Sequence, residues 1–345
     1  MLRSGAEAYF TEQSIHKQAN TGMKIKLVVM LGLYAIPYFF ILGELYTGLL
    51  SFLCLWVIMA AGMTGVGAGI MHDANHGALA RENRQNHWMG KIICLLGVDQ
   101  LNWKIQHNIL HHTYTNIEGH DDSLHGGKLL RFSPHQPWLP HHRYQQFYAW
   151  FLYPLQTVVW FLVTDFVRLR HYRKTGMLPD QGKHYARLWA ELLGWKCVYA
   201  LCLLIIPMVC ISAPWWWVVA GFLLMQCITG FFLSLVFLCS HIVPLCNYPL
   251  PDKGNRMESH WLVHEMHTSA NYAMCGKWFT WFVGGLNFQV EHHLFPHVCH
   301  VHYPALSVLV KDAAEKYGVP YNSYRYFSTA IRAHARMLKS LGKPA

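Results

Sequence analysis

Long stretches of this sequence contain no charged residue. Residues 197–241 contain no Asp, Glu, Lys or Arg, which is enough for two membrane-spanning helices of about 20 residues each. Residues 27–43 and 49–70 are equally free of charge and are each of membrane-spanning length. The sequence therefore predicts four spans in two helical hairpins. The expected spans are residues 27–43, 49–70, 197–213 and 217–240.

The composition agrees with a membrane protein. Hydrophobic residues make up 53% of the chain and charged residues only 13%, whereas charged residues are about a quarter of a typical soluble protein. Residues 88–101 and 147–166 are also apolar, but they are shorter or rich in aromatic side chains, and this favours interfacial helices over spans. The predicted fold is an all-α polytopic membrane protein with a single domain over residues 1–345. Residues 71–196 and 241–345 are expected to form a helical cap.

Positive residues predict the orientation of the hairpins. Lys24 and Lys26 precede the first span, Arg81 and Arg84 follow the second, and the links within both hairpins carry none. This bias places both termini and the cap on the cytosolic side. The formal net charge is +10, but the basic residues are dispersed, which fits an anionic lipid surface or acyl carrier better than nucleic acid.

The chain has 24 histidines, and several fall into three short clusters. The clusters are HDANH at residues 72–76, HNILHH at 107–112 and QVEHH at 289–293. All three lie on the side of the membrane predicted for the cap. Pairs separated by four residues share one face of a helix, so each such pair can hold one metal or bracket two. The clustered histidines are His72, His76, His107, His111, His112, His292 and His293.

The histidine clusters can be interpreted either as structural residues or as metal ligands. The pair in HDANH alone is equally consistent with interfacial histidines at a helix end, although Asp73 could fix an imidazole tautomer. Three histidines within six residues have no packing reason. An all-imidazole set suits Zn, Cu, Fe or Ni, and seven ligands exceed the four of one tetrahedral zinc site. The pattern predicts two metals beside long apolar helices, and hence redox chemistry on a lipid.

The three clusters resemble the histidine boxes of membrane fatty acid desaturases. The segment QVEHHLFP at residues 289–296 is similar to the third box of the front-end and linoleoyl-CoA-type members, in which glutamine replaces the first histidine. The segments WKIQH at 103–107, HTYTN at 112–116 and EKYGVPY at 315–321 are also similar to that group. The resemblance extends from about residue 69 to the tail.

The resemblance implies a set of site residues. The seven clustered histidines would be ligands of two iron ions, with O2 as co-substrate, and Gln289 would be a ligand or a close neighbour. A further ligand is expected from WLVH at residues 261–264, with His264 the first choice and His267 the second. Glu265 stands where many relatives have glutamine. His120 and His241 could lie near the site. Surface or supporting positions are expected for His135, His141, His142, His297, His300 and His302.

The resemblance also implies an activity and partners. The expected enzyme introduces a cis double bond into the chain of a fatty acyl-CoA or acyl lipid held in a narrow apolar tunnel. Hydroxylation on the same site is the nearest alternative. A non-enzymatic transporter or receptor would place charged residues inside its spans, which the expected spans lack.

The electron donor and the membrane follow from the same resemblance. Front-end members often carry a fused cytochrome b5 domain with a His-Pro-Gly-Gly motif, which is missing here. We therefore expect a separate ferredoxin or cytochrome b5 as donor. The protein would be an integral multi-pass protein with a cytosolic active site, for which a bacterial inner membrane is favoured and the endoplasmic reticulum is the alternative.

Overall fold

The computed structural model describes residues 2–179 and 184–344, and these are mostly helical. The all-α prediction is therefore confirmed. Within the described residues, the strands are β1 (Asn271–Tyr272) and β2 (Ser323–Tyr324), which form one short parallel pair with Asn271 opposite Ser323.

The first hairpin joins α2 (Thr21–Leu42) to α3 (Leu49–Gly65). The side chain of Asn20 accepts a hydrogen bond from the Met23 amide at 3.0 Å and so caps α2. The two helices touch closely at Gly62, where a Cβ atom would lie 2.4 Å from the backbone nitrogen of Tyr34. After α3 the helix continues through the π-helical segment Val66–Ile70 into α4 (Met71–Asn75).

The second hairpin contains long helices over the other two predicted spans. Its first arm consists of α11 (Tyr185–Ala200), the π-helical segment Leu201–Ile205 and α12 (Ile206–Cys210), and its second arm is α13 (Trp215–His241). The first arm begins 12 residues before residue 197, the predicted start of the third span, which directly follows Lys196. That lysine is buried and forms an ion pair with Asp165 at 2.6 Å, so its charge does not end the helix.

A further long helical run crosses the molecule beside α13. It comprises α8 (Gln145–Leu152), α9 (Gln156–Val159) and α10 (Asp165–Lys174), linked by one-turn segments. The whole run from Pro140 to Lys174 has the length and composition of a membrane span, so the described residues contain five candidate spans where four were expected. The interfacial position predicted for residues 147–166 is therefore not supported. Residues 88–101 fall, as expected, in short helices.

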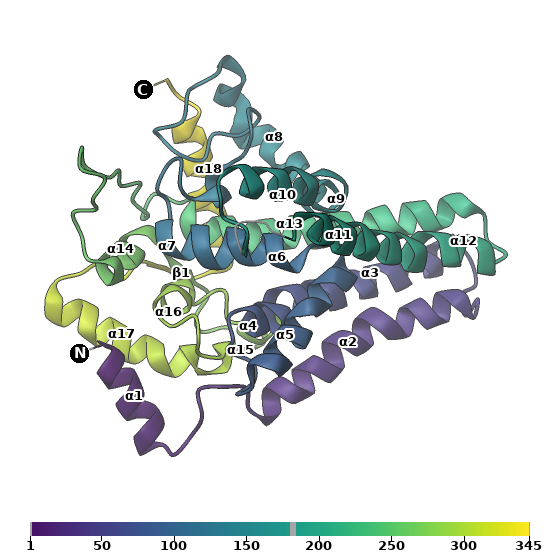
Figure 1. Ribbon diagram of the computed structural model, residues 1–345, viewed down its shortest axis with the longest axis horizontal. Helices are drawn as coiled ribbons and strands as arrows, with labels where there is room; N and C mark the ends of the chain where they lie inside the picture. The colour runs from purple at the N-terminus through teal and green to yellow at the C-terminus, as the bar shows by residue number, and fades with distance from the viewer. Residues whose placement is uncertain (1, 180–183, 345) are drawn as a thin grey trace.

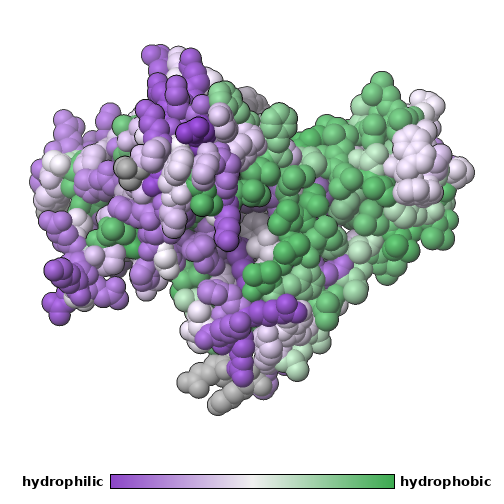
Figure 2. All heavy atoms as spheres, turned by 90° about the horizontal axis from the view of Figure 1, so that it is seen from above, coloured by the Kyte–Doolittle hydropathy of each residue, from purple (hydrophilic) through white to green (hydrophobic). Residues whose placement is uncertain are grey.

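The molecule has an apolar half and a polar half. In Figure 1 the two hairpins project together on the right, away from the cap, and Figure 2 shows that apolar residues cover this projecting part. Large apolar side chains stand fully outward there, such as Val28, Leu50 and Val209 with exposures of 71%, 79% and 77%. This surface suits the interior of a bilayer.

The cap consists of short helices packed on the ends of the hairpins. The helix α17 (Tyr303–Tyr317) ends at Gly318, which adopts a φ of +63°. In the cap, α1 packs against α17, and α18 packs against α13. Its helices are α1 (Leu2–Glu12), α5 (Asn83–Lys91), α6 (Gln100–Lys104), α7 (His112–Tyr114), α14 (Trp261–Thr268), α15 (Lys277–Phe282), α16 (Gln289–Leu294), α17 (Tyr303–Tyr317) and α18 (Phe327–Leu341).

Candidate metal centre

The clustered histidines converge at the point where the hairpins enter the cap. His72 lies on α4 and His76 ends it, His107 and His111 belong to the π-helical segment Ile105–His111, and α16 carries the third cluster. All seven clustered histidines are buried. Chain segments more than 200 residues apart in the sequence thus bring imidazoles together in one place.

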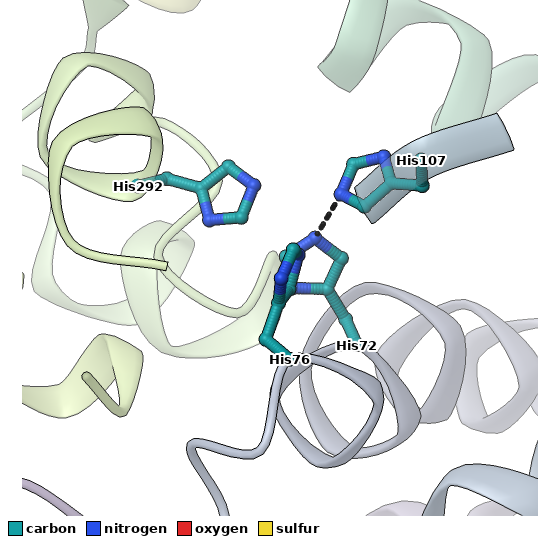
Figure 3. Close-up of side chains that lie close together, drawn as sticks. All are labelled: His72, His76, His107 and His292. Carbon is teal, nitrogen blue, oxygen red and sulfur yellow. Dashed lines mark hydrogen bonds between the residues drawn. The ribbon is translucent and has the colours of Figure 1, made fainter. Parts of the chain in front are cut away.

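A first group of imidazoles surrounds one point. One nitrogen from each of His72, His76, His107 and His292 lies within 4.8 Å of the others, and Figure 3 shows the four rings facing one another. The Nε2 atoms of His72 and His107 are 3.0 Å apart. Among the described residues the buried Nε2 atom of His76 has no hydrogen-bond partner. Such a nitrogen, aimed at other nitrogens, fits a shared metal ion.

A second group lies beside the first. It consists of His111, His241 and His293, again with one nitrogen from each within 4.8 Å of the others. The buried Nε2 atom of His111 also has no hydrogen-bond partner among the described residues. Between the groups, His112 Nε2 lies 2.9 Å from His292 Nε2 and 3.3 Å from His107 Nε2. The two groups therefore form one continuous imidazole cluster with room for two ions.

The π-helical turn explains how the second sequence cluster serves both groups. Its backbone bond runs from the His112 amide to the His107 carbonyl, five residues back. This wider turn brings the rings of His107 and His112 together and directs His111 to the other group. The pair His107 and His111 was expected to hold one metal or bracket two, and the structure places the two side chains in different groups. Turns of this kind are frequent at functional sites.

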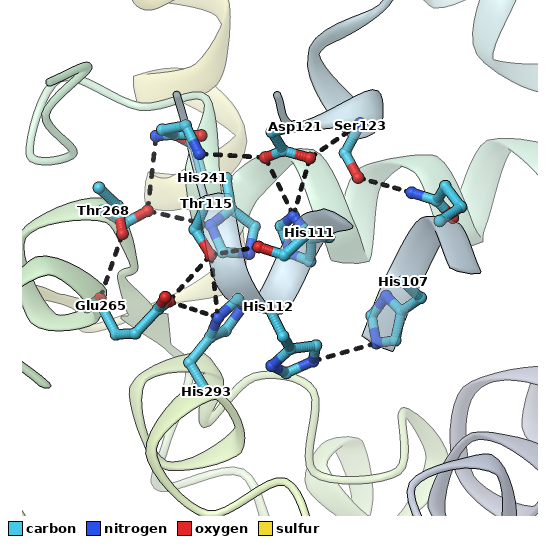
Figure 4. A network of polar contacts seen from close by, with 12 residues as sticks. His107, His111, His112, Thr115, Asp121, Ser123, His241, Glu265, Thr268 and His293 are labelled. Carbon is cyan, nitrogen blue, oxygen red and sulfur yellow. Dashed lines mark hydrogen bonds and ion pairs between the residues drawn. The ribbon is translucent and has the colours of Figure 1, made fainter. Parts of the chain in front are cut away.

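The outward nitrogens of the second group are held by oxygen atoms. His111 Nδ1 is 3.1 Å from a carboxylate oxygen of Asp121, and His293 Nδ1 is 2.6 Å from Glu265. His241 Nδ1 donates to the Thr268 carbonyl at 3.0 Å. Each of these bonds leaves Nε2 facing inward, as Figure 4 shows for the labelled network. A carboxylate or carbonyl behind an imidazole is the usual support of a metal ligand.

The first group has a similar support. Asp73 lies 3.8 Å from His72 Nδ1 and accepts a hydrogen bond from His300 Nδ1 at 2.7 Å. His292 Nδ1 lies 3.3 Å from the Tyr303 hydroxyl. The sequence placed His300 among the supporting histidines, and the structure agrees.

Burial and crowding keep the imidazoles of the cap neutral. Removal from water, followed by the repulsion of neighbouring imidazoles, lowers the pKa of His107, His112, His292 and His293 well below the usual value. A neutral imidazole is the form that binds a metal. The cluster is thus preset for ligation at neutral pH.

The expected ligand His264 lies apart from both groups. His264 does not join either group, because its Nε2 atom lies 2.9 Å from the Thr115 carbonyl oxygen, to which it donates. His267 lies further out, beside the Asn247 side chain at 3.3 Å. His241 lies in the second group, and its ring contacts those of His111 and His293 with centroids 4.8 and 4.9 Å away. His241 ends the fourth apolar run, just as His72 follows the second. This similarity in position was the feature of the sequence that could have indicated His241 as a site residue.

The other expected residues divide as follows. The amide of Gln289 lies 3.0 Å from His241 Nε2 and 3.3 Å from His293 Nε2, so it borders the second group. His120 is exposed, but the neighbouring Asp121 supports the site. The remaining histidines bond to backbone carbonyls elsewhere: His135 to Tyr248, His141 and His142 to Lys128, His297 to His76 and His302 to Gln18.

A cavity of about 360 Å³ opens beside the cluster. Its walls come from the apolar helices, with Met63, Leu96, Leu233 and Phe237 among the lining side chains. It reaches His72, His107 and Gln289 of the imidazole cluster. An elongated apolar molecule in this cavity would lie against the candidate metal centre.

Comparisons with known proteins agree with this site. The family model described as fatty acid desaturase matches residues 48–325. The chain is 33% identical to the sn-1 linoleoyl-lipid 6-desaturase of Synechocystis over 99% of its own length and 95% of that protein. It is 31% identical to the protein of the same name from Arthrospira platensis (99% and 91% covered) and 30% identical to the acyl-lipid (8-3)-desaturase of Physcomitrium patens (99% and 71%). With the matched boxes now placed around one buried cluster, the chain belongs to the fatty acid desaturase family.

Proposed function

We propose that this protein is an O2-dependent acyl-lipid desaturase that holds two iron ions in the imidazole cluster and introduces a cis double bond. The observation that carries the proposal is the contact between an all-imidazole cluster and an apolar cavity. The names of the relatives support an acyl lipid as substrate, although acyl-CoA has the same reacting chain.

The residues present fit two iron ions. His72, His76, His107 and His292 would hold one ion, and His111, His241 and His293 the other, with His112 available between them. The donor set contains imidazole nitrogen and no thiolate, which suits iron. Two bound irons supply a means of reducing O2 and of breaking an unactivated C–H bond. The ligand geometry is held by Asp121, Glu265 and the Thr268 carbonyl.

The reaction balances with an external donor. A –CH2–CH2– unit of the acyl chain loses two hydrogen atoms, and these join two electrons and two protons from outside to convert O2 into two waters. The protein places the chain, because the cavity walls orient one C–C bond towards the cluster and exclude bulk water. We infer that a separate ferredoxin or cytochrome b5 supplies the electrons on a cytosolic face.

Hydroxylation on the same site is the second candidate. The two outcomes share the metals and the cavity, and they differ in whether a second hydrogen or an oxygen atom is transferred. Gln289 at the border of the second group supports desaturation, because this residue replaces histidine in the desaturase boxes that the sequence resembles. The two candidates are separated by their products.

Expression in a host of known fatty acid profile tests the proposal. Fatty acid methyl esters are analysed by gas chromatography, with His111→Ala as the inactive control, and iron is measured in the purified protein. A new unsaturated ester in the wild type and not in the control is the expected result. A hydroxylated ester would replace the proposal with the second candidate, and a wild type without bound iron would refute it.

A further inference from the structure

The cavity has one polar end. Its lining there comes from Asp122, Ser123 and His125 of the cap and from Arg168 of α10. Polar side chains deeper in the cavity are already paired: Thr157 donates to the Gln226 carbonyl, and Ser234 bonds to Gln156. The polar end therefore differs from the rest of the wall in carrying the charged side chains of Asp122 and Arg168.

Arg168 is the free donor at this end. Its Nη1 atom is buried and has no hydrogen-bond partner among the described residues. Of the residues that line the cavity, only His72 of the cluster shares that property within the described ranges. A buried donor without a partner costs free energy unless a ligand fills the place.

Neighbouring side chains orient the guanidinium of Arg168 but do not use all of its hydrogen-bond donors. Its Nε atom lies 4.0 Å from an Asp122 carboxylate oxygen, and the group stacks over Trp160 with 5.2 Å to the ring centroid. The same Asp122 oxygen accepts the Tyr172 hydroxyl at 2.7 Å. These contacts hold the guanidinium at the polar end of the cavity, while Nη1 keeps no hydrogen-bond partner among the described residues.

A three-residue turn ties this arginine to the metal centre. Asp121 holds His111 at 3.1 Å, the next residue Asp122 faces Arg168, and Ser123 accepts a hydrogen bond from Gln106 at 2.6 Å. Gln106 directly precedes His107. Asp122 therefore links the arginine to a turn whose adjacent residues contact His111 and the residue before His107.

We propose that Arg168 binds the carbonyl oxygen at the head of the acyl chain and so sets the carbon at which the double bond forms. This inference rests on the proposed desaturase function. The carbonyl is the polar atom that an acyl ester or thioester offers to a buried N–H donor, whereas the methylene chain fits the apolar remainder of the cavity. The position of the double bond would then depend on the distance between this anchor and the imidazole cluster.

The test compares Arg168→Gln and Arg168→Lys with the matched control Arg170→Gln, on the same helix. Arg170 is exposed and stacks on Trp189 away from the cavity. Double-bond positions in the products are mapped by mass spectrometry of derivatised esters. Binding of methyl stearate and of octadecane to the purified wild type and variants is measured by displacement of a fluorescent fatty acid, independently of turnover.

The wild type is expected to bind the ester more tightly than the alkane. Arg168→Gln should weaken ester binding about ten- to a hundredfold, as for a lost hydrogen bond to a charged group, leave alkane binding unchanged and give mixed double-bond positions. Arg168→Lys keeps the charge and should retain part of the preference. Arg170→Gln should match the wild type.

Other results would overturn the inference. If Arg168→Gln, with normal iron content, keeps both the ester preference and a single double-bond position, the arginine is not the anchor. If Arg168→Gln does not fold, the Arg168→Lys variant is used for the decision. An unchanged double-bond position and an unchanged ester affinity in Arg168→Lys would exclude the guanidinium contact. A wild type that makes no unsaturated product would instead refute the proposed function, whatever the variants bind.

Discussion

His293 Nδ1 and a carboxylate oxygen of Glu265 lie 2.6 Å apart, and both side chains are fully buried. The hydroxyl of Thr115 lies 2.9 Å from the same oxygen. The carboxylate therefore fixes the imidazole with its other nitrogen directed to the metal centre. Glutamine, which many members of the resembled family have at this position, would present an uncharged amide whose nitrogen donates hydrogen bonds but accepts none.

Replacing this carboxylate should weaken metal binding. We expect Glu265→Ala to lower iron affinity about 10- to 100-fold, the usual loss when the support of a metal-binding histidine is removed. Iron per chain is measured after dialysis against graded chelator concentrations. The control is Glu258→Ala, which removes an exposed carboxylate shortly before α14. Equal iron retention in the two variants would show that Glu265 does not support the ligand.

The two histidines that compete for the remaining ligand position should behave differently. We expect His241→Ala to lose iron from the second group, because its Nε2 atom faces His111 and His293. His264→Ala should keep its iron and lose only the hydrogen bond to the Thr115 carbonyl, worth about 1 kcal/mol. Iron content and thermal unfolding are measured on both variants in detergent. Iron loss in His264→Ala with retention in His241→Ala would reverse the assignment.

The sequence predicted much of this site because its ligands lie in dense local clusters. HDANH, HNILHH and QVEHH each place two or three imidazoles within six residues, and all seven histidines meet in the cluster. His241 is a lone histidine at the end of α13, and its role depends on the packing of that helix against α16, which local spacing cannot show. The residue spacing also does not predict the π-helical turn at Ile105–His111. In this turn the His107 carbonyl accepts the backbone hydrogen bond of residue 112 instead of residue 111.

The sequence predicted the spans that contain no charged residue, but it did not predict the full extent of the membrane-length helices that contain the two paired charges. All four charge-free runs form long helices. The fifth candidate helix contains Asp165. The third predicted span was expected to begin after Lys196, but its helix begins earlier and includes this lysine. Each charge alone ends an apolar run in the sequence, but together they form one buried ion pair. A prediction from single residues cannot see this compensation.

This pair should contribute strongly to stability. Lys196 Nζ donates to Asp165 at 2.6 Å and to the Gly97 carbonyl at 2.7 Å, and Asp165 is fully buried. Lys196→Ala leaves a buried carboxylate without its partner, which costs about 3–5 kcal/mol. We expect a large fall in the thermal unfolding temperature, partly restored in the double variant Lys196→Met with Asp165→Asn. The exposed pair of Arg187 and Glu191 at 3.1 Å provides the control, because Arg187→Ala should change little. Similar shifts in both single variants would contradict the prediction.

His334 should make the cap sensitive to acid. Its buried ring accepts from the Tyr153 hydroxyl at 2.7 Å and donates to the Ile242 carbonyl at 2.8 Å, and burial lowers its pKa to about 4. The unfolded chain, with a histidine pKa of about 6.5, binds a proton more readily than the folded one, so stability falls as the pH drops from about 6.5 to 4, by up to about 3 kcal/mol. We expect His334→Gln, which can keep one donor and one acceptor, to be less stable at pH 7 and less dependent on pH in this window. Unfolding temperatures of wild type and variant are compared at constant ionic strength, on metal-loaded protein and after chelation. Because acid also protonates the imidazole cluster, the difference between wild type and variant isolates His334. Parallel profiles would show that this ring does not titrate with unfolding.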